Sequence, residues 1–221
     1  MRNGMRMSHW VRIGLIAAAG LLAAGCTTSR ITTTYYNISG VTGADLDREI
    51  ARKGPLKGHA LASTAIKFVP VAIRYDESGG KCRYASARFR IEANVTLPRW
   101  RQHPSSDPEL RSAWKYLANY AREHEDVHIA IAEKYAAKIA DELEAIPAKK
   151  SCDSLDAAAE VVLKRNRHEH NREQLAFDAA EQKRRQRNRS IAIALALGVL
   201  VLLLYIVTVV KLGPGILTRP L

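Results

Sequence analysis

The chain has 221 residues, of which 47% are apolar and only 6% aromatic, and its formal net charge is +12. Without a processed N-terminus and a membrane segment, about 160 residues remain, which is the size of one domain and excludes a second catalytic core. The charge argues against a nucleic-acid partner, because it gathers in two basic groups that each precede an apolar run. The middle of the chain has no basic and aromatic pattern of nucleic-acid recognition.

The N-terminus has the three parts of a secretory signal: a basic head through Arg12, an apolar run over residues 13–24, and small residues before Cys26. Residues 22–26, Leu-Ala-Ala-Gly-Cys, resemble a bacterial lipobox, whose cysteine is lipidated and becomes the first residue. We therefore expect a lipoprotein-type signal peptide over residues 1–25 and lipid on Cys26. Ordinary cleavage nearby and an uncleaved anchor are the alternatives, and both also place the following domain outside the cytoplasm.

The cysteine count fits an exported protein. Three cysteines are an odd number, but once Cys26 is assigned to lipid, Cys82 and Cys152 remain as a possible pair. We predict a disulfide between them, which closes a loop of about 70 residues and stabilises the fold by a few kcal/mol. Two unpaired buried thiols are the alternative.

Near the other end, residues 191–210 form a run without charge that is long enough to cross a bilayer. We predict a transmembrane helix over residues 190–211 and a short tail over 212–221; a buried core helix is the alternative. The basic run 183–189 favours the cytoplasm by the positive-inside tendency, whereas export delivers it to the other side. We follow the export signal and expect the run to contact anionic lipid headgroups.

Residues 27–188, between the two anchors, are expected to form one α+β domain. The region 31–100 is strand-like around a short helix at 44–52, and its clearest strand is 83–97, where apolar and polar residues alternate. Pro98 is expected to end this strand. We predict a small, mostly antiparallel sheet followed by long helices.

The first long helix begins after Asp107, a suitable cap, and Pro108, a suitable first residue, and is expected to run to about Ala145. It contains the sequence His124-Glu125-Asp126-Val127-His128, a zincin-like HExxH motif. The periodicity places both histidines near one apolar stripe, whose other members are Leu117, Tyr120, Ala121, Ile131 and Tyr135.

Two histidines four residues apart on a helix can present two imidazole nitrogens to one ion. Glu125 lies beside them, where a carboxylate can take a proton from the water that zinc activates. We therefore predict a zinc site with His124 and His128 as ligands and Glu125 as the catalytic base. Two surface histidines on a solvated helix face are the alternative.

Three segments of the chain resemble one bacterial family of unknown function whose members are described as secreted zinc-dependent proteases. The segments are residues 35–40, 94–100 and 124–130, and the likeness runs from about Thr33 to Phe177. Cys82 and Cys152 lie in similar contexts. The resemblance implies an α+β zinc peptidase in which His124 and His128 are ligands and Glu125 is the base.

The chain departs from that family near the end of the likeness. Members usually show a tyrosine-aspartate pair followed by histidine-glycine, whereas this chain has Phe177-Asp178 and then Lys183 at the histidine position. The matched carboxylate makes Asp178 the favoured third ligand. Glu181, His168 and His170 are the alternatives, although the two histidines are better explained by a charged helix face.

The sequence thus predicts a zinc-dependent peptidase of the cell envelope, anchored in a membrane with its main domain in the periplasm. Its expected partners are a peptide or protein substrate and membrane lipid. Tyr116 and Tyr135 are expected to pack in the core, and the strand end at Leu97 to border the substrate cleft. The principal alternative is a non-catalytic envelope lipoprotein that binds partners through a degenerate metal site; another zinc hydrolase, such as a cell-wall amidase, is a third reading.

Overall fold

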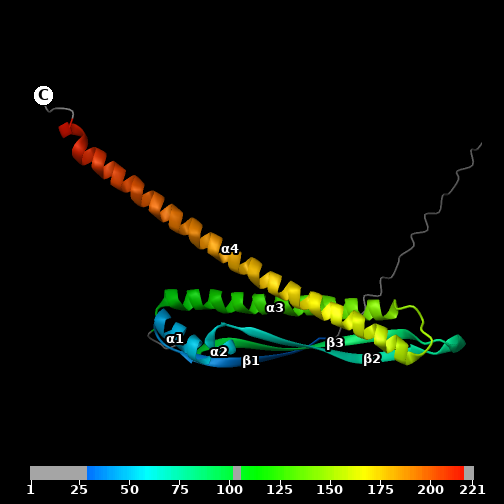
Figure 1. Ribbon diagram of the computed structural model, residues 1–221. Helices are drawn as coiled ribbons and strands as arrows, with labels where there is room; N and C mark the ends of the chain where they lie inside the picture. Colours follow the sequence, from blue (N-terminus) through cyan, green and yellow to red (C-terminus); the bar gives the residue numbers. More distant parts are fainter. Residues whose placement is uncertain (1–28, 102–105, 217–221) are drawn as a thin grey trace, which may run out of the picture.

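The computed structural model describes residues 29–101 and 106–216, with side chains up to residue 211 (Figure 1). The elements in chain order are β1 (Ser29–Ser39), α1 (Gly43–Lys53), α2 (Pro55–Gly58), β2 (Ser63–Asp76), the 3-10 turn η1 (Ser78–Gly80), β3 (Arg83–Arg101), α3 (Pro108–Glu144) and α4 (Cys152–Ile216). The fold is α+β. The predicted signal peptide, the predicted lipid site at Cys26 and the last five residues of the predicted tail lie outside the described residues.

The three strands form one mixed sheet in the order β1-β3-β2. β2 and β3 are antiparallel because the short turn η1 joins them directly. β1 is parallel to β3 because the chain crosses over through α1 and α2 before it returns as β2. The prediction of a mostly antiparallel sheet is therefore wrong in its pairing: one strand pair is antiparallel and the other is parallel.

Strand β3 runs through Pro98 to Arg101, so the prediction that Pro98 ends the strand is also wrong. The last residue of β3 that pairs with β2 is Thr96, and beyond it β3 pairs with β1 alone. A proline is tolerated there because every second residue of a strand with one neighbour has no ladder hydrogen bond to donate.

Alternation along β3 has the predicted result, since one of its faces is buried. Ile91, Ala93, Val95 and Leu97 are almost fully buried, and they pack against α3 residues that include Ala121, Ile129 and Ala132. Figure 1 shows α3 lying along this face of the sheet. The small alanine side chains allow the helix to approach the strands closely, which fixes the face of α3 that points to the sheet.

Helix α3 has the predicted ends. The Asp107 side chain accepts a 2.8 Å hydrogen bond from the Glu109 backbone N–H, Pro108 is the first helical residue, and Ala145 is the C-cap. The short helix α1 also forms as expected: Thr42 and Asp45 make a capping box, and Gly54 follows its last turn. Trp100 and Trp114 pack with Ile38 and Leu46 to hold the beginning of α3 against α1 and β1.

Helix α4 packs along α3 and then continues away from the body of the molecule (Figure 1). Ion pairs connect the two helices: Lys134 to Glu173 at 2.6 Å, and Arg165 to Glu142 at 2.7 Å. The beginning of α4 is tied to the sheet by a disulfide between Cys82 and Cys152. α4 therefore has a fixed position against α3 along the part that carries the candidate site.

The far part of α4 does not pack on the protein. Every residue from 186 to 211 is exposed, and α4 is the one helix in the described part of the chain that is long and apolar enough to cross a membrane. No break separates this apolar part from the part that packs on α3.

Candidate metal centre

Two neighbouring faces of α3 carry the HExxH residues. Glu125 lies on the stripe that faces the sheet, in line with Ala121 and Ile129, whereas His124 and His128 face α4. The predicted apolar stripe combined residues of both faces, since it placed Ala121 together with the two histidines. It also included Leu117, which is exposed. One residue corresponds to a rotation of about 100° on a helix, so Glu125 and the two histidines approach one space from two directions.

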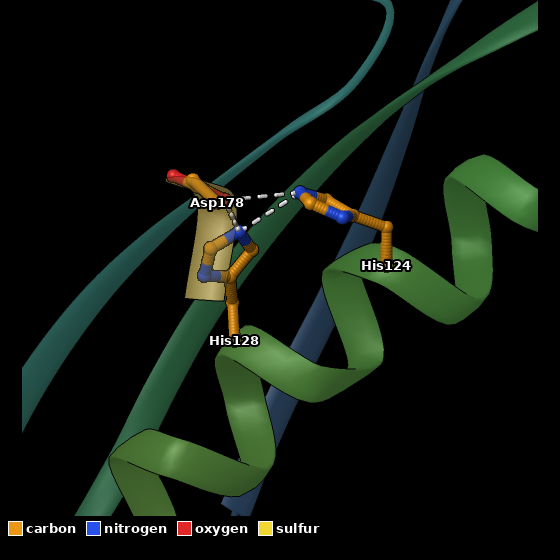
Figure 2. A group of neighbouring side chains, drawn as sticks. All are labelled: His124, His128 and Asp178. Carbon is orange, nitrogen blue, oxygen red and sulfur yellow. Dashed lines mark hydrogen bonds and ion pairs between the residues drawn. The ribbon is translucent and has the colours of Figure 1, made fainter. Parts of the chain in front are cut away.

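The structure brings His124, His128 and Asp178 together (Figure 2). The Nε2 atoms of the two histidines lie 3.1 Å apart. Oδ1 of Asp178, which comes from α4, lies 3.3 Å from His124 Nε2 and 3.1 Å from His128 Nε2. The favoured third ligand and the two motif histidines thus form a triangle of three possible ligand atoms.

Hydrogen bonds at the other ring nitrogens decide which atoms of the histidines carry protons. Nδ1 of His124 lies 3.2 Å from Oε2 of Glu181, and an ionised carboxylate can only accept. Nδ1 of His128 contacts Oε1 of Gln174, whose Nε2 donates to the backbone oxygen of His128 at 3.0 Å. Both Nδ1 atoms are therefore donors, and in the neutral rings each Nε2 atom has the lone pair that a metal can bind.

In the neutral rings, three lone-pair-bearing atoms, the two Nε2 atoms and Oδ1 of Asp178, face one another within hydrogen-bonding distance. A metal ion among the three atoms, or a proton on one of the rings, stabilises such an arrangement. For tetrahedral zinc with nitrogen and oxygen ligands, the edges between ligand atoms are about 3.3–3.5 Å, close to the 3.1–3.3 Å found here. The donor set fits zinc, and the orienting acceptors on Nδ1 are the usual partners of metal-binding histidines.

Glu125 is a buried carboxylate beside this triangle. Its side chain accepts a 2.7 Å hydrogen bond from Oγ1 of Thr64, at the beginning of β2. Burial raises the pKa of Glu125 above its ordinary value, and the hydrogen bond from Thr64 opposes this rise. Burial, followed by the nearby charge of His128, lowers the pKa of His124, which favours the neutral imidazole that a metal requires.

A cleft of about 480 Å³ opens over these residues. It is lined by His124, Glu125, His128 and Asp178, by Asn171, Gln174 and His170 of α4, and by apolar and hydroxyl residues from 56–66. The Asp178 side chain is 49% exposed, so the triangle is open to solvent on the side of α4. β3 contributes no residue to the lining, and the prediction that its end at Leu97 borders the cleft is wrong: the beginning of β2 does so.

The remaining candidate ligands lie outside the triangle. Glu181 contacts His124 at the opposite ring nitrogen, His168 is exposed, and Lys183 is exposed beyond the cluster. His170 is buried, so the prediction of a charged helix face is wrong for it: its ring packs edge-on against Phe68 and Tyr135. Its Nε2 accepts a 2.9 Å hydrogen bond from Gln174.

Two aromatic predictions have different outcomes. Tyr135 is buried as expected, and its hydroxyl donates to Glu173 at 3.0 Å, but Tyr116 is 75% exposed and does not pack in the core. Phe177, the residue before Asp178, packs against both histidines, with ring centroids 4.9 Å from His124 and 5.3 Å from His128.

Sequence patterns did not predict the contacts of Gln174 and Glu181 with the Nδ1 atoms of the two histidines. With Asp178, they have spacings of four and three residues, which place all three on one face of α4. This periodicity was the available signal. Thr64 has no comparable sequence signal, because its contact with Glu125 depends on where β2 lies against α3.

A family model described as "Bacterial protein of unknown function (DUF922)" matches residues 33–185, well over half of the chain. A second, described as "Uncharacterized protein 2 in cox locus", matches residues 165–216, which cover most of α4. Neither the curated proteins nor the solved structures gave a match. The first match contains all of the sheet except the first four residues of β1, together with α3 and the part of α4 that carries Asp178, so the chain belongs to the DUF922 family of bacterial proteins of unknown function.

Proposed function

We propose that this protein is a membrane-anchored, extracytoplasmic zinc-dependent peptidase. His124, His128 and Asp178 hold the zinc, and Glu125 is the general base. The observation that carries the proposal is the convergence of three possible ligand atoms beside a cleft that also contains a buried carboxylate. A structural ion site alone would have no need of Glu125, whose burial costs stability.

When bound, zinc supplies a Lewis acid that activates water and polarises a carbonyl. Glu125 accepts the proton of the attacking water and gives it to the leaving amine. A carboxyl group with a raised pKa suits this double role, because it holds a proton more readily than an exposed glutamate does. Thr64 keeps one carboxylate oxygen oriented throughout.

Strand β2 offers a place for the substrate backbone. Among the described residues it pairs with β3 alone, so it is an edge strand, and Ser63 and Thr64 at its beginning line the cleft. We propose that an extended peptide pairs with this edge and passes over the ligand triangle. Strand addition of this kind binds the backbone without requiring particular side chains.

The location is proposed from the two anchors. The signal-like N-terminus exports the domain, and the apolar part of α4 spans the membrane with the basic run 183–189 at the headgroups. A topology reporter fused after Leu221 tests this orientation. We expect the reporter to be active only on the cytoplasmic side; a reporter that is active only in the periplasm contradicts the proposed orientation.

Zinc content is the first test. Elemental analysis of the full chain in detergent is expected to find about one zinc per molecule after loading and dialysis. The double variant His124→Ala, His128→Ala is expected to lose it while keeping the helical circular dichroism spectrum of the parent. A parent chain that does not retain zinc overturns the proposal.

Glu125→Gln separates the peptidase from the non-catalytic envelope protein. The variant keeps the shape and the hydrogen bond with Thr64 but cannot take a proton. We expect it to bind zinc as the parent does and to lose cleavage of a peptide library. If the zinc-loaded parent cleaves nothing, the binding role is the better account; if it cleaves only cell-wall peptides, the amidase is.

A further inference from the structure

The helix that supplies Asp178 is the same helix that enters the membrane. α4 is continuous from Cys152 to Ile216, and it carries Gln174, Asp178 and Glu181 before the apolar run. The distance of the site from the bilayer is therefore fixed by helix geometry and not by a linker.

The body of the protein holds α4 almost to the membrane boundary. The guanidinium of Arg185 lies 4.4 Å from the centre of the Tyr120 ring, and its Nε donates to the Tyr120 hydroxyl at 3.1 Å. Arg184 pairs with Glu181 at 2.8 Å. Only four residues, 186–189, lie between this last contact and Ser190, where the uncharged run begins.

At 1.5 Å per residue, Asp178 lies about 18 Å along the helix from Ser190, and tilt of the helix brings it nearer still to the bilayer. Arg185 lies about 8 Å from Ser190, within the depth of the headgroup layer. The basic residues of the run 183–189 hold this part of the helix at an anionic surface. The ligand triangle therefore stands just outside the headgroups.

We propose that the substrates are themselves membrane-anchored and are cleaved in the segment next to their own anchor. An extended chain rises 3.3–3.6 Å per residue, so 18 Å corresponds to about five or six residues of substrate. A bond at that position reaches the triangle directly, whereas bonds far from the anchor must fold back toward the membrane. This inference rests on the proposed peptidase function and on insertion of α4.

The test uses the full chain, loaded with zinc and reconstituted in vesicles of phosphatidylcholine and phosphatidylglycerol. A sequence selected from cleavage of a soluble peptide library is placed about 5, 8, 11 and 25 residues from the apolar segment of a single-span carrier peptide. The expected result is cleavage at least about tenfold faster at the near positions than at the farthest one. Equal rates at all positions overturn the inference and leave the peptidase standing.

A length variant makes the test specific for α4. Seven helical residues inserted after Arg189 raise the site by about 10 Å and preserve the helix face, because seven residues are close to two turns. The preferred position is expected to move outward by about three residues. The same insertion after Lys211, beyond the span, is the matched control and is expected to move nothing. If the insertion after Arg189 also leaves the preferred cleavage position unchanged, α4 does not set that position and the inference is wrong. If no sequence in the library is cleaved, both the inference and the proposed function are wrong.

Discussion

Gln174 holds His128 at two points: its Oε1 accepts from Nδ1 of the ring, and its Nε2 donates to the backbone oxygen of the same residue at 3.0 Å. The second bond fixes which way the amide points, and the amide in turn fixes the tautomer of the ring. Nε2 of the ring therefore points toward Oδ1 of Asp178, which lies 3.1 Å away. Orientation of this kind strengthens metal binding, because less freedom is lost when the metal binds.

Replacing Gln174 by leucine is expected to weaken zinc binding by roughly 10–100-fold, since the ring of His128 loses its orienting acceptor. Competition with a fluorescent zinc chelator measures the change. Gln182→Leu, at an exposed position two turns further along α4, is the control and is expected to bind zinc as the parent does. Equal affinities in both variants would show that the amide does not orient a ligand.

Asp178→Ala is expected to lower zinc affinity by at least 10–100-fold, because it removes one of the three converging atoms. His168→Ala, which changes an exposed residue outside the triangle, is expected to have no effect. Zinc titration of both variants distinguishes the ligand sets that the sequence leaves open. Loss of zinc binding in His168→Ala together with full binding in Asp178→Ala would identify His168, and not Asp178, as the third ligand.

Removing the disulfide by the double change Cys82→Ser, Cys152→Ser is expected to lower the free energy of unfolding by about 2–5 kcal/mol, as for a cross-link that closes a 70-residue loop. Zinc affinity is also expected to fall, since Cys152 begins the helix that carries Asp178. Urea unfolding of the zinc-free and zinc-loaded full chain measures both effects. The parent treated with reductant serves as the matched comparison and should behave as the variant does.

Tyr36 gives a test of the fold at high pH. Burial raises the pKa of its hydroxyl to about 12, and the hydroxyl donates to the backbone oxygen of Leu61 at 2.7 Å. In the unfolded chain the pKa is about 10. The folded state thus binds this proton more tightly, so the contribution to stability is complete below about pH 10 and is lost as the pH rises toward 12.

Tyr36→Phe is therefore expected to destabilise the chain below about pH 10 by about 1 kcal/mol through the lost hydrogen bond, and by less than that near pH 11. Urea unfolding at the two pH values measures the difference between variant and parent. Tyr116→Phe, at an exposed position, is the control, and its difference from the parent in unfolding free energy should be the same at both pH values. A Tyr36→Phe difference that stays constant with pH would contradict the linkage.

Local signals in the sequence predicted much of the fold. Asp107 and Pro108 fixed the beginning of α3, and Gly54 the end of α1, because caps act on their own helix turn. The alternation from Ile91 to Leu97 predicted the buried face of β3. Each of these features depends on neighbours within a few residues.

The features of the sheet that were predicted wrongly have a different cause, because they depend on segments far away in the chain. The parallel pairing of β1 with β3 depends on where the crossover through α1 and α2 leads. β3 can continue through Pro98 because its pairing with β2 stops at Thr96 of β3. The site shows the same division: His124, Glu125 and His128 are read from one helix, whereas Thr64 is known only once β2 lies against α3.

The position of Glu125 has a consequence for the evolution and engineering of this protein. It occupies the stripe of α3 where Ala121 and Ile129 pack, and in a helix selected only for stability this position would carry an aliphatic residue. Substitutions that make the domain more stable are therefore expected to fall on the residue to which we assign the proposed general-base role. Selection for heat tolerance without a selection for function is therefore expected to replace Glu125 early, and the product would be a more stable protein that keeps both histidines but lacks the proposed base.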